Sequence, residues 1–594
     1  MNRLTAPNAY DSRASSPWGP PNIWDSLAAI LIFSVLILVG FYGRQMVGKF
    51  SLGQSIPIYL EPKYLPHYAM RTVIRLFIAL SWSWIFTFIF GTMAAKNRLA
   101  ARIILPAIDI LQSVPILSFL SLAIAGFIVL FKGNLLGPEF AAIFAVFTAQ
   151  VWNITLGFYQ SLSSVPYEFK EVGRMHQLSS WKSFWKIEVP FCMPSLVWNT
   201  MISMSGSWFF VIACEAFSVA GASVTLPGIG SYIFMAINKA NHQAIYAAIV
   251  AMLLVILGYD QLIFRPLVYW LNRFEAHEEE EIKRPLIVEL FYRGKMIHIL
   301  SYWLNLFSAF WLNLPWLNHS PSTLKRSERQ FNLNLDSWHF AAILTGKILL
   351  IFSAAALFGY IGFSALKYLR TFLTLPLLTK VLTLGVFTGI RVIVLVLLAS
   401  VIWVPVGVWV GLRPRLVKFI QPLLQFVAAF PANLLFPWVA IIILRFKLNV
   451  ELCVAPLMIL GTQWYILFNV IAGISQLPSD LKLVAANLQI SGWLWWKRII
   501  LPYLAPYLIT GAITAAGGAW NASIVAEIVN WGPWHLEATG LGAFIQKSFN
   551  ANNTEHLLLG TLVMCLVVLL LNQAIWQPLY NYALKRLEQN QGET

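Results

Sequence analysis

The chain has 594 residues, of which 58% are hydrophobic and only 11% are charged, against the roughly 25% charged residues of soluble proteins. This composition excludes a soluble globular fold and predicts an integral membrane protein. The net charge of +16 does not indicate nucleic acid, because the Lys and Arg residues are scattered through short loops between apolar segments and form no basic domain.

The first 24 residues are polar and contain Pro and Gly, and we expect them to form a cytoplasmic N-terminal tail. The apolar run that follows begins too far into the chain, and is too long, for a cleaved signal peptide. We therefore expect this first run to stay in the protein as a membrane anchor.

Apolar stretches of the ~20 residues that a bilayer requires follow one another along the chain. They lie near residues 25–46, 72–95, 104–131, 139–161, 193–216 and 244–270, and again near 340–362, 380–411, 419–444, 452–474, 503–528 and 556–582. The predicted fold is an all-α polytopic membrane protein with two tandem domains of six helices, about 12 transmembrane helices in all.

The two halves are copies of each other, since Pro166 to Trp270 aligns without a gap with Pro478 to Tyr582 at a constant offset of 312 residues. We call this shift the repeat offset. The shared positions include prolines, glycines, tryptophans and a glutamate, which chance similarity between two apolar segments would not align. The chain is therefore a tandem duplication. We call residues 25–274 copy one and residues 339–586 copy two, and residues 587–594 form a short C-terminal tail.

A cytoplasmic linker, residues 275–338, is expected between the copies. It contains the acidic run Glu278 to Glu281 and then a tryptophan-rich stretch that is interrupted by Asn305, Asn313 and Pro315. We expect a helix lying in the membrane interface near residues 295–320. The alternative is a further span, which would give the two copies opposite orientations.

The positive-inside rule sets the orientation. Cations gather in the loop after the second span of each copy (Lys96, Arg98 and Arg102; Arg413, Arg415 and Lys418) and again after the fourth span. With these loops in the cytoplasm, both termini are cytoplasmic and the two copies are parallel, related by an axis along the membrane normal. Parallel halves of this kind suit a transporter.

The polar stretch after the fourth span of each copy is predicted to form a helix, a tight turn and a second helix. The acidic residues of its first turn favour the positive end of a helix, and its serines can cap the second helix, which we expect to stop at a proline. These residues are Glu168, Ser179, Trp181 and Pro190 in copy one, and Asp480, Ser491, Trp493 and Pro502 in copy two.

This stretch resembles the cytoplasmic EAA motif of ABC importer permeases, in which Glu-Ala-Ala, a glycine and Ile-x-Leu-Pro occur at fixed spacing. Glu171 begins the motif in copy one, and Leu483 stands at the same position in copy two. Gln177 and Gln489 replace the motif glycine. The resemblance implies two coupling helices seated in the clefts of a cytoplasmic ABC ATPase dimer. Because Leu483 replaces the motif glutamate in copy two, we expect copy one to make the stronger polar contact.

Other segments resemble the nitrate, sulfonate and taurine class of these permeases. They are Thr72 to Arg75 against Thr388 to Arg391, Leu111 to Pro115 against Leu424 to Pro431, and a Trp…Glu…Gly-x-Gly pattern in both copies. The chain looks like the duplicated form, often called an anion-transport permease. This resemblance implies a type I importer fold in the bacterial inner membrane, a small anion as substrate, an extracytoplasmic solute-binding protein, and one chain in place of a permease dimer.

No GxxxxGK[ST] sequence is present, so the chain is not expected to bind ATP, and ATP and Mg would belong to the partner ATPase. No catalytic constellation and no metal-ligand spacing is recognisable, and no cofactor is expected. The four cysteines have no paired spacing and are expected to be small hydrophobic residues: Cys192, Cys214, Cys453 and Cys565.

Three pairs of repeated residues are candidates for the transport pathway or its gate: Glu215 and Glu527, Arg75 and Arg391, Trp208 and Trp520. A buried carboxylate costs about 2.5–3.5 kcal/mol in a span, so each glutamate either joins helices through a hydrogen bond or lines the pathway. Each arginine either snorkels to the interface or forms an electropositive vestibule. The Gly-x-Gly pairs, Gly228 with Gly230 and Gly540 with Gly542, are expected in outer turns.

The main alternative is a secondary transporter of the major-facilitator type, which also has two parallel halves of six spans. That class predicts an acidic residue in the loop between spans 2 and 3, which is absent here, and no paired hairpin after span 4. A membrane enzyme or an assembly scaffold is a third possibility without a supporting motif.

Overall fold

The computed structural model describes residues 23–49, 56–113, 126–219, 222–239, 241–271, 371–429, 435–475, 479–531, 534–551 and 553–583, with isolated positions between them. Residues 1–22 of the N-terminal tail, almost all of the linker and the predicted span at 340–362 lie outside the described residues. The same is true of the C-terminal tail.

In copy one, helices account for most of the described chain. They are α1 (Ile23–Gln45), α2 (Leu65–Phe86), α3 (Thr92–Lys96), α4 (Arg98–Ser113), α6 (Leu136–Ser163), α7 (Tyr167–Met175), α8 (Ser180–Ser183), α9 (Val189–Glu215), α10 (Ile229–Asn238), α11 (His242–Tyr259) and α12 (Arg265–Leu271). A 3-10 turn (Pro62–Tyr64) precedes α2, and π-turns at Thr87–Gly91, Phe184–Glu188 and Asp260–Phe264 join successive helices without a break.

Copy two has a matching order of elements. They are α16 (Leu375–Gly411), α17 (Pro414–Ala429), α18 (Phe436–Arg445), α19 (Val450–Leu460), α20 (Trp464–Ser475), α21 (Ser479–Asn487), α22 (Gly492–Trp495), α23 (Leu501–Ala526), α24 (Leu541–Asn550) and α25 (Thr554–Leu571). Its π-turns, Trp496–Ile500 and Asn572–Trp576, are shifted from two of those in copy one by the repeat offset. The duplication is therefore preserved even in the irregular turns.

Two short antiparallel β-hairpins modify the all-α prediction. Strand β1 (Ala216–Val219) pairs with β2 (Ala222–Thr225), and β3 (Ile528–Trp531) pairs with β4 (Trp534–Glu537), again at the repeat offset. Each hairpin follows the fifth span and leads into the short helix α10 or α24. Each copy thus contains a small strand pair, after its fifth span, that the hydropathy of the spans does not predict.

Seven helices in the described part of the chain are long and apolar enough to cross a membrane, or eight if one bent pair is counted as a single span. That pair is α19 and α20, which meet at an angle of 45° around Gly461. The predicted spans at 104–131 and 419–444 are described only in part, as the shorter helices α4, α17 and α18. The structure therefore supports a polytopic protein, while the number twelve remains a prediction.

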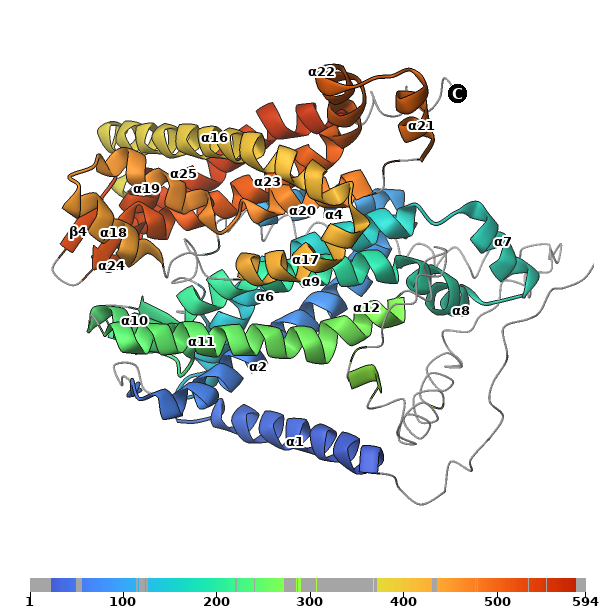
Figure 1. The fold of residues 1–594 in the computed structure, drawn as a ribbon. Helices are drawn as coiled ribbons and strands as arrows, with labels where there is room; N and C mark the ends of the chain where they lie inside the picture. The colour runs from blue at the N-terminus through green and yellow to red at the C-terminus, as the bar shows by residue number, and fades with distance from the viewer. Residues whose placement is uncertain are drawn as a thin grey trace, which may run out of the picture.

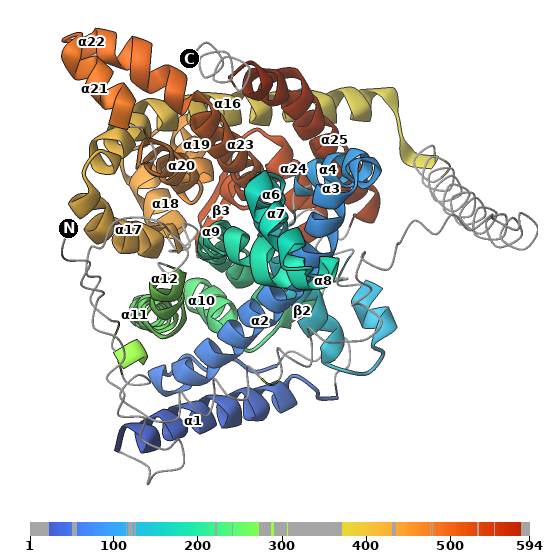
Figure 2. The same ribbon diagram turned by 90° about the vertical axis from the view of Figure 1, so that its right-hand side faces the viewer.

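Each copy has its own hydrophobic core, and the copies exchange their third spans. Helix α17 of copy two packs on α9 of copy one, and α4 of copy one contacts α25 of copy two (Figure 2). A hydrogen bond also joins the copies: the side chain of Asn521, on α23 of copy two, accepts from the backbone N–H of Ile116 of copy one at 2.6 Å. Figure 1 shows α7, α8, α21 and α22 at one end of the molecule and α10, α24 and β4 at the other.

Candidate functional site

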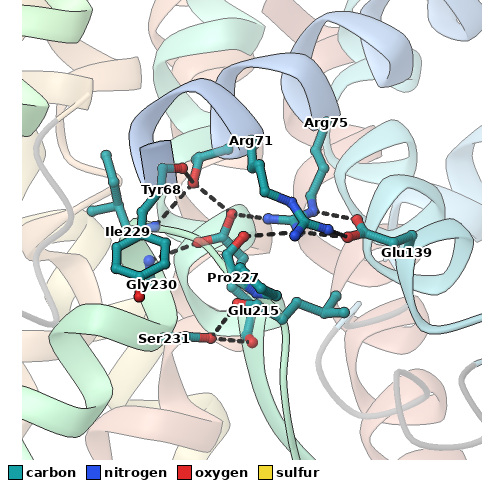
Figure 3. Close-up of polar contacts among 11 residues, drawn as sticks. Tyr68, Arg71, Arg75, Glu139, Glu215, Pro227, Ile229, Gly230 and Ser231 are labelled. Atoms are coloured by element: carbon teal, nitrogen blue, oxygen red, sulfur yellow. Dashed lines mark hydrogen bonds and ion pairs between the residues drawn. The ribbon is translucent and has the colours of Figure 1, made fainter. Parts of the chain in front are cut away.

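A cluster of four charged residues lies inside copy one, in the half that carries the β-hairpin and α10. Arg75, on α2, has no exposed surface, and its guanidinium lies between two carboxylates (Figure 3). Its Nε donates to Glu139 Oε2 at 2.5 Å, and its Nη1 donates to Glu215 Oε1 at 2.6 Å. Glu139 lies on α6, and Glu215 is the last residue of α9. One arginine therefore joins the second, fourth and fifth spans of the copy.

The charges of this cluster balance. Arg71, one turn before Arg75, places its Nη2 2.6 Å from Glu139 Oε1, so that two guanidinium groups face two carboxylates. Pairing of this kind removes much of the cost of burying each charge in an apolar bundle. The cluster is consequently a neutral, buried junction between helices.

Glu215 also holds the outer turn that follows the β-hairpin. It accepts a hydrogen bond of 2.6 Å from the Thr72 hydroxyl and one of 2.6 Å from the backbone N–H of Gly230, at the first turn of α10. A Cβ atom on Gly228 would collide with the Glu215 carboxylate, and one on Gly230 would collide with the backbone of Ile212. The Gly-x-Gly sequence thus provides the space in which this carboxylate meets the helix end.

Copy two repeats the cluster in a more open form. Arg391 Nη1 lies 3.1 Å from Glu527 Oε1, its Nη2 contacts Glu451, and Thr388 donates to Glu527 at 2.8 Å. The side chains of Arg391 and Glu451 are 16% and 42% exposed, against 0% and 1% for Arg75 and Glu139. Phe387 occupies the position of Arg71, so a single arginine faces two carboxylates.

These contacts correct the expectation for Arg75. Arg75 neither snorkels to the interface nor lines a vestibule, because its charge is enclosed and paired on both sides. Arg391 is paired in the same way, although it is partly exposed. Glu215 and Glu527 each accept hydrogen bonds from two different helices and so join them. Their role in gating stays a prediction.

Sequence reasoning overlooked Glu139 and Glu451, the carboxylates that complete the two clusters. Both lie near the start of an apolar segment, and they are separated by the repeat offset. The sequence did contain a signal for them, because a glutamate recurs at the repeat offset inside an apolar segment. Arg71 has no counterpart in copy two and could not have been found in this way.

The two candidate tryptophans are packed inside their own copies. Trp208 has no exposed surface, and its indole Nε1 donates to the Tyr259 hydroxyl at 3.1 Å. Trp520 is 2% exposed and lies against Gly389. Neither indole has surface free to line a pathway in this structure.

The predicted hairpin of copy one, which we call hairpin one (residues 166–190), forms at the opposite end of the molecule from the charge cluster. Pro166 is the N-cap of α7, and Glu168 lies in its first turn. The Ser179 hydroxyl caps α8 by accepting from the N–H of Lys182 at 3.2 Å.

Gln177 makes the tight turn with a φ of 49°, in the left-handed region. Glu171 is exposed, and Trp181 packs beside Trp185.

Hairpin two (residues 478–502) has the same backbone with different side-chain contacts. Gln489 has a φ of 51°, which places it in the same left-handed turn as Gln177. Ser491 makes no side-chain cap, contrary to the prediction, and is followed by Gly492 with a φ of 59°. Asp480 lies in the first turn of α21, whereas Pro478 lies outside the described residues. The Trp493 side chain is 74% exposed.

The prediction that each hairpin ends at its second proline is wrong. Pro190 and Pro502 lie within the first two residues of α9 and α23, and a π-turn joins each hairpin directly to the fifth span. A proline has no N–H to donate, and the wider π-turn just before it changes the hydrogen-bond pattern at the point where that donor is missing. Each hairpin is therefore a continuous extension of a span and can move with it.

Apolar side chains are exposed on both hairpins. In the part of the chain that the structure describes they include Tyr167, Phe169, Val172 and Met175 on hairpin one, and Leu483, Val484, Leu488, Trp493 and Leu494 on hairpin two. Exposed apolar patches beyond the expected membrane surface indicate contact with another protein. The described residues contain no group of His, Cys, Asp and Glu able to hold a metal ion.

Residues 87–264 and 403–575 both match the family described as binding-protein-dependent transport system inner membrane component. The match occurs twice and covers more than half of the chain. It confirms the resemblance that was drawn from the sequence motifs, including the duplication.

Among individual relatives, the bicarbonate transport system permease protein CmpB of Synechococcus elongatus is 32% identical over 178 residues, which are 30% of this chain and 61% of the relative. The nitrate import permease protein NrtB of Leptolyngbya laminosa is 26% identical over 185 residues, 31% of this chain and 63% of that protein. The trimethylamine N-oxide transport system permease protein TmoV of Pelagibacter ubique is 24% identical over 234 residues, which are 39% of this chain and 30% of that protein. The aligned part thus spans about three fifths of the length of the first two relatives.

Proposed function

The chain belongs to the family of binding-protein-dependent transport system inner membrane components, and on that premise we propose that it forms both halves of the membrane pathway of an ABC importer. It is a multi-pass protein of the inner membrane, and its two copies take the place of a permease dimer. The major-facilitator alternative receives no support from the family match.

The observation that carries this proposal is the pair of matching hairpins at one end of the molecule. Helices α7 and α21 have the same length and are related by the repeat offset, and a left-handed glutamine follows each of them. Both hairpins expose apolar side chains and continue into a fifth span. Two equal protrusions related by a pseudo-two-fold axis fit a dimeric partner, and an ABC ATPase dimer offers two equivalent clefts.

In this assignment the hairpins face the cytoplasm, and the ATPase subunits hold ATP and Mg. The charge clusters and β-hairpins then lie toward the outer face, where a solute-binding protein would deliver its cargo. The basic loops beside the hairpins support this orientation through the positive-inside rule, and the orientation places both termini in the cytoplasm.

A small inorganic anion is the substrate class that the relatives support best. Two of them are described by their names as permeases for bicarbonate and for nitrate, and a more distant one as a permease for trimethylamine N-oxide. The buried clusters do not offer a free positive charge to an anion, because each of their guanidinium groups is paired within the described residues. Anion selection therefore rests on the binding protein and on neutral groups of the pathway.

Copurification tests the proposal. When the chain is expressed with its ATPase, we expect a complex whose ATP hydrolysis is inhibited by vanadate. The double variant Val172→Asp, Leu483→Asp places a charge in both apolar contacts and should abolish copurification, whereas Lys132→Asp, in the turn before α6 at the opposite end, should leave it unchanged. A parent chain that captures no ATPase would contradict the assignment.

A further inference from the structure

An ion pair ties hairpin one to the second span of copy one. Lys96, the last residue of α3, places its Nζ 2.7 Å from Glu188 Oε2, in the π-turn that ends the hairpin. Glu188 is 9% exposed, and Lys96 also lies over the Phe184 ring at 4.8 Å from its centroid. A nearly buried carboxylate is strongly disfavoured without a cation, so this pair holds the two elements together.

The helix that carries Lys96 is continuous with the one that carries Arg75. Residues Pro62–Lys96 form a single helical segment of 35 residues, and at 1.5 Å per residue Arg75 and Lys96 are about 30 Å apart along its axis. The π-turn within it is held to α6, because the Thr87 hydroxyl lies 2.9 Å from that of Thr155 and Gly91 packs against Phe158. The part of the segment from Arg75 to Lys96 is therefore held by ion pairs at both of its ends and by contacts with α6 in between.

Hairpin one is also packed tightly onto the turn that bears Glu188. A Cβ atom on Gly173 of α7 would lie 3.0 Å from Ser183 Oγ and 3.1 Å from Ile187 Cδ1, so the helix cannot shift without moving this turn. Contacts thus run without interruption from α7, through Glu188 and Lys96, to the outer cluster of Arg75. Coupling between distant sites is carried by contiguous networks of this kind.

Copy two has no counterpart of this connection. The residues at the positions of Lys96 and Glu188 are Leu412 and Ile500, and Ala485 replaces Gly173. Its outer cluster is also more exposed, as described above. The ion pair that joins the hairpin to the second span in copy one thus has no charged counterpart at the matching positions of copy two.

We propose that Lys96 and Glu188 are positioning residues that transmit movement of hairpin one to the outer charge cluster, so that copy one carries the larger share of the coupling. This inference rests on the proposed function. It predicts that an ATP-driven change at the hairpins reaches the outer turn of copy one, residues 225–238, through this ion pair.

Hydrogen exchange of the complete complex with its ATPase, with and without Mg-ATP and vanadate, measures that transmission. In Lys96→Met and in Glu188→Gln the nucleotide-dependent change at residues 225–238 should fall about fivefold or more, at the lower end of typical coupling factors. Residues 537–550 of copy two provide an internal control whose change should persist. Arg98→Met, which removes a neighbouring exposed cation, should behave like the parent.

The charge-reversed double variant Lys96→Glu, Glu188→Lys separates transmission from folding, since it should restore the response at residues 225–238 while the single variants lose it. Single variants that respond as the parent does would overturn the inference, and so would a double variant that stays uncoupled although it is folded and bound to the ATPase. A parent complex that fails to assemble would instead contradict the proposed function itself.

Discussion

At the scale of single residues, the charged side chains of the outer clusters show how an apolar bundle tolerates ionic groups. Arg75 reaches Glu139, Glu215 and the carbonyl oxygen of Pro227 at once, which satisfies most of its donors in one geometry. A planar guanidinium suits such a junction better than an ammonium group does, because its donors diverge in fixed directions. Arg391 makes fewer contacts and keeps access to solvent.

We therefore expect Arg75→Met to destabilise the protein by about 3–5 kcal/mol, because it leaves the buried carboxylate of Glu215 without its cation. Arg391→Met should cost less, since Arg391 is 16% exposed and lies 3.1 Å from the buried Glu527, which keeps hydrogen bonds from Thr388 and from the backbone N–H of Ala543. Its other partner, Glu451, is 42% exposed and retains two hydrogen bonds of 2.8 Å from Thr539. Thermal unfolding in detergent measures the difference, with the exposed Arg98→Met as control. Equal losses at the two arginines would show that burial does not distinguish the clusters.

The sequence identified these residues only in part. The pairs Arg75 with Arg391 and Glu215 with Glu527 stood out because they repeat, but hydropathy could not show that they meet each other. The expected position at an interface or in a vestibule was wrong for Arg75, because a single sequence shows a cation near the end of a span and not the carboxylate of a neighbouring span. For Arg391, which is 16% exposed, it stays a prediction. Glu139 supplies that partner from 64 residues away.

At the scale of elements, the hairpins combine a shared backbone with different surfaces. A glutamine with a φ near 50° occupies the left-handed region that glycine adopts without strain. The EAA motif has glycine at this position, and the conformation persists here although the residue has changed. Backbone hydrogen bonds close the turn in both hairpins, such as the one that the N–H of Leu178 donates to the carbonyl oxygen of Gly173 at 3.0 Å.

Gln177→Gly should hold or raise the local stability of hairpin one, by up to about 1 kcal/mol, because it relieves the left-handed strain. Gln177→Val should lower it, since a β-branched residue fits this region poorly. Amide hydrogen exchange of residues 167–177 reports the change. As a control, Gln160→Gly in the ordinary helix α6 should destabilise by about 1 kcal/mol, and stabilisation there would contradict the explanation.

The two hairpins also differ where they are expected to meet the ATPase. Glu171→Ala should lower transport-coupled ATP hydrolysis more than Leu483→Ala, because it removes a charged contact for which copy two has no equivalent. Hydrolysis by the reconstituted complex measures both variants under the same conditions. Equal reductions would rule out unequal coupling through these two positions.

Most helices followed from hydropathy and from proline and serine positions, whereas the departures have local causes. The helix does not end at Pro190 because a π-turn precedes it, and Ser491 does not cap because Gly492 adopts a left-handed conformation. The β-hairpins were not predicted because four-residue strands are too short to produce a clear alternation.

At the scale of the whole molecule, the chain contains two permease domains that pack against each other, as the proposed fused dimer requires. Each has its own core and each receives a helix from the other, α4 or α17. The Tyr465 hydroxyl of copy two lies against Gly206 on α9 of copy one, so the fifth span is in direct contact with the opposite half. Duplication allows the two halves to diverge, as the Lys96–Glu188 pair of copy one shows.

Native mass spectrometry of the complex with its ATPase gives the decisive test of this fused-dimer assignment. A chain that supplies both halves should be found as one permease chain with two ATPase domains. Two copies of this chain for each ATPase dimer would show that every chain provides only half of the pathway, and would contradict the assignment.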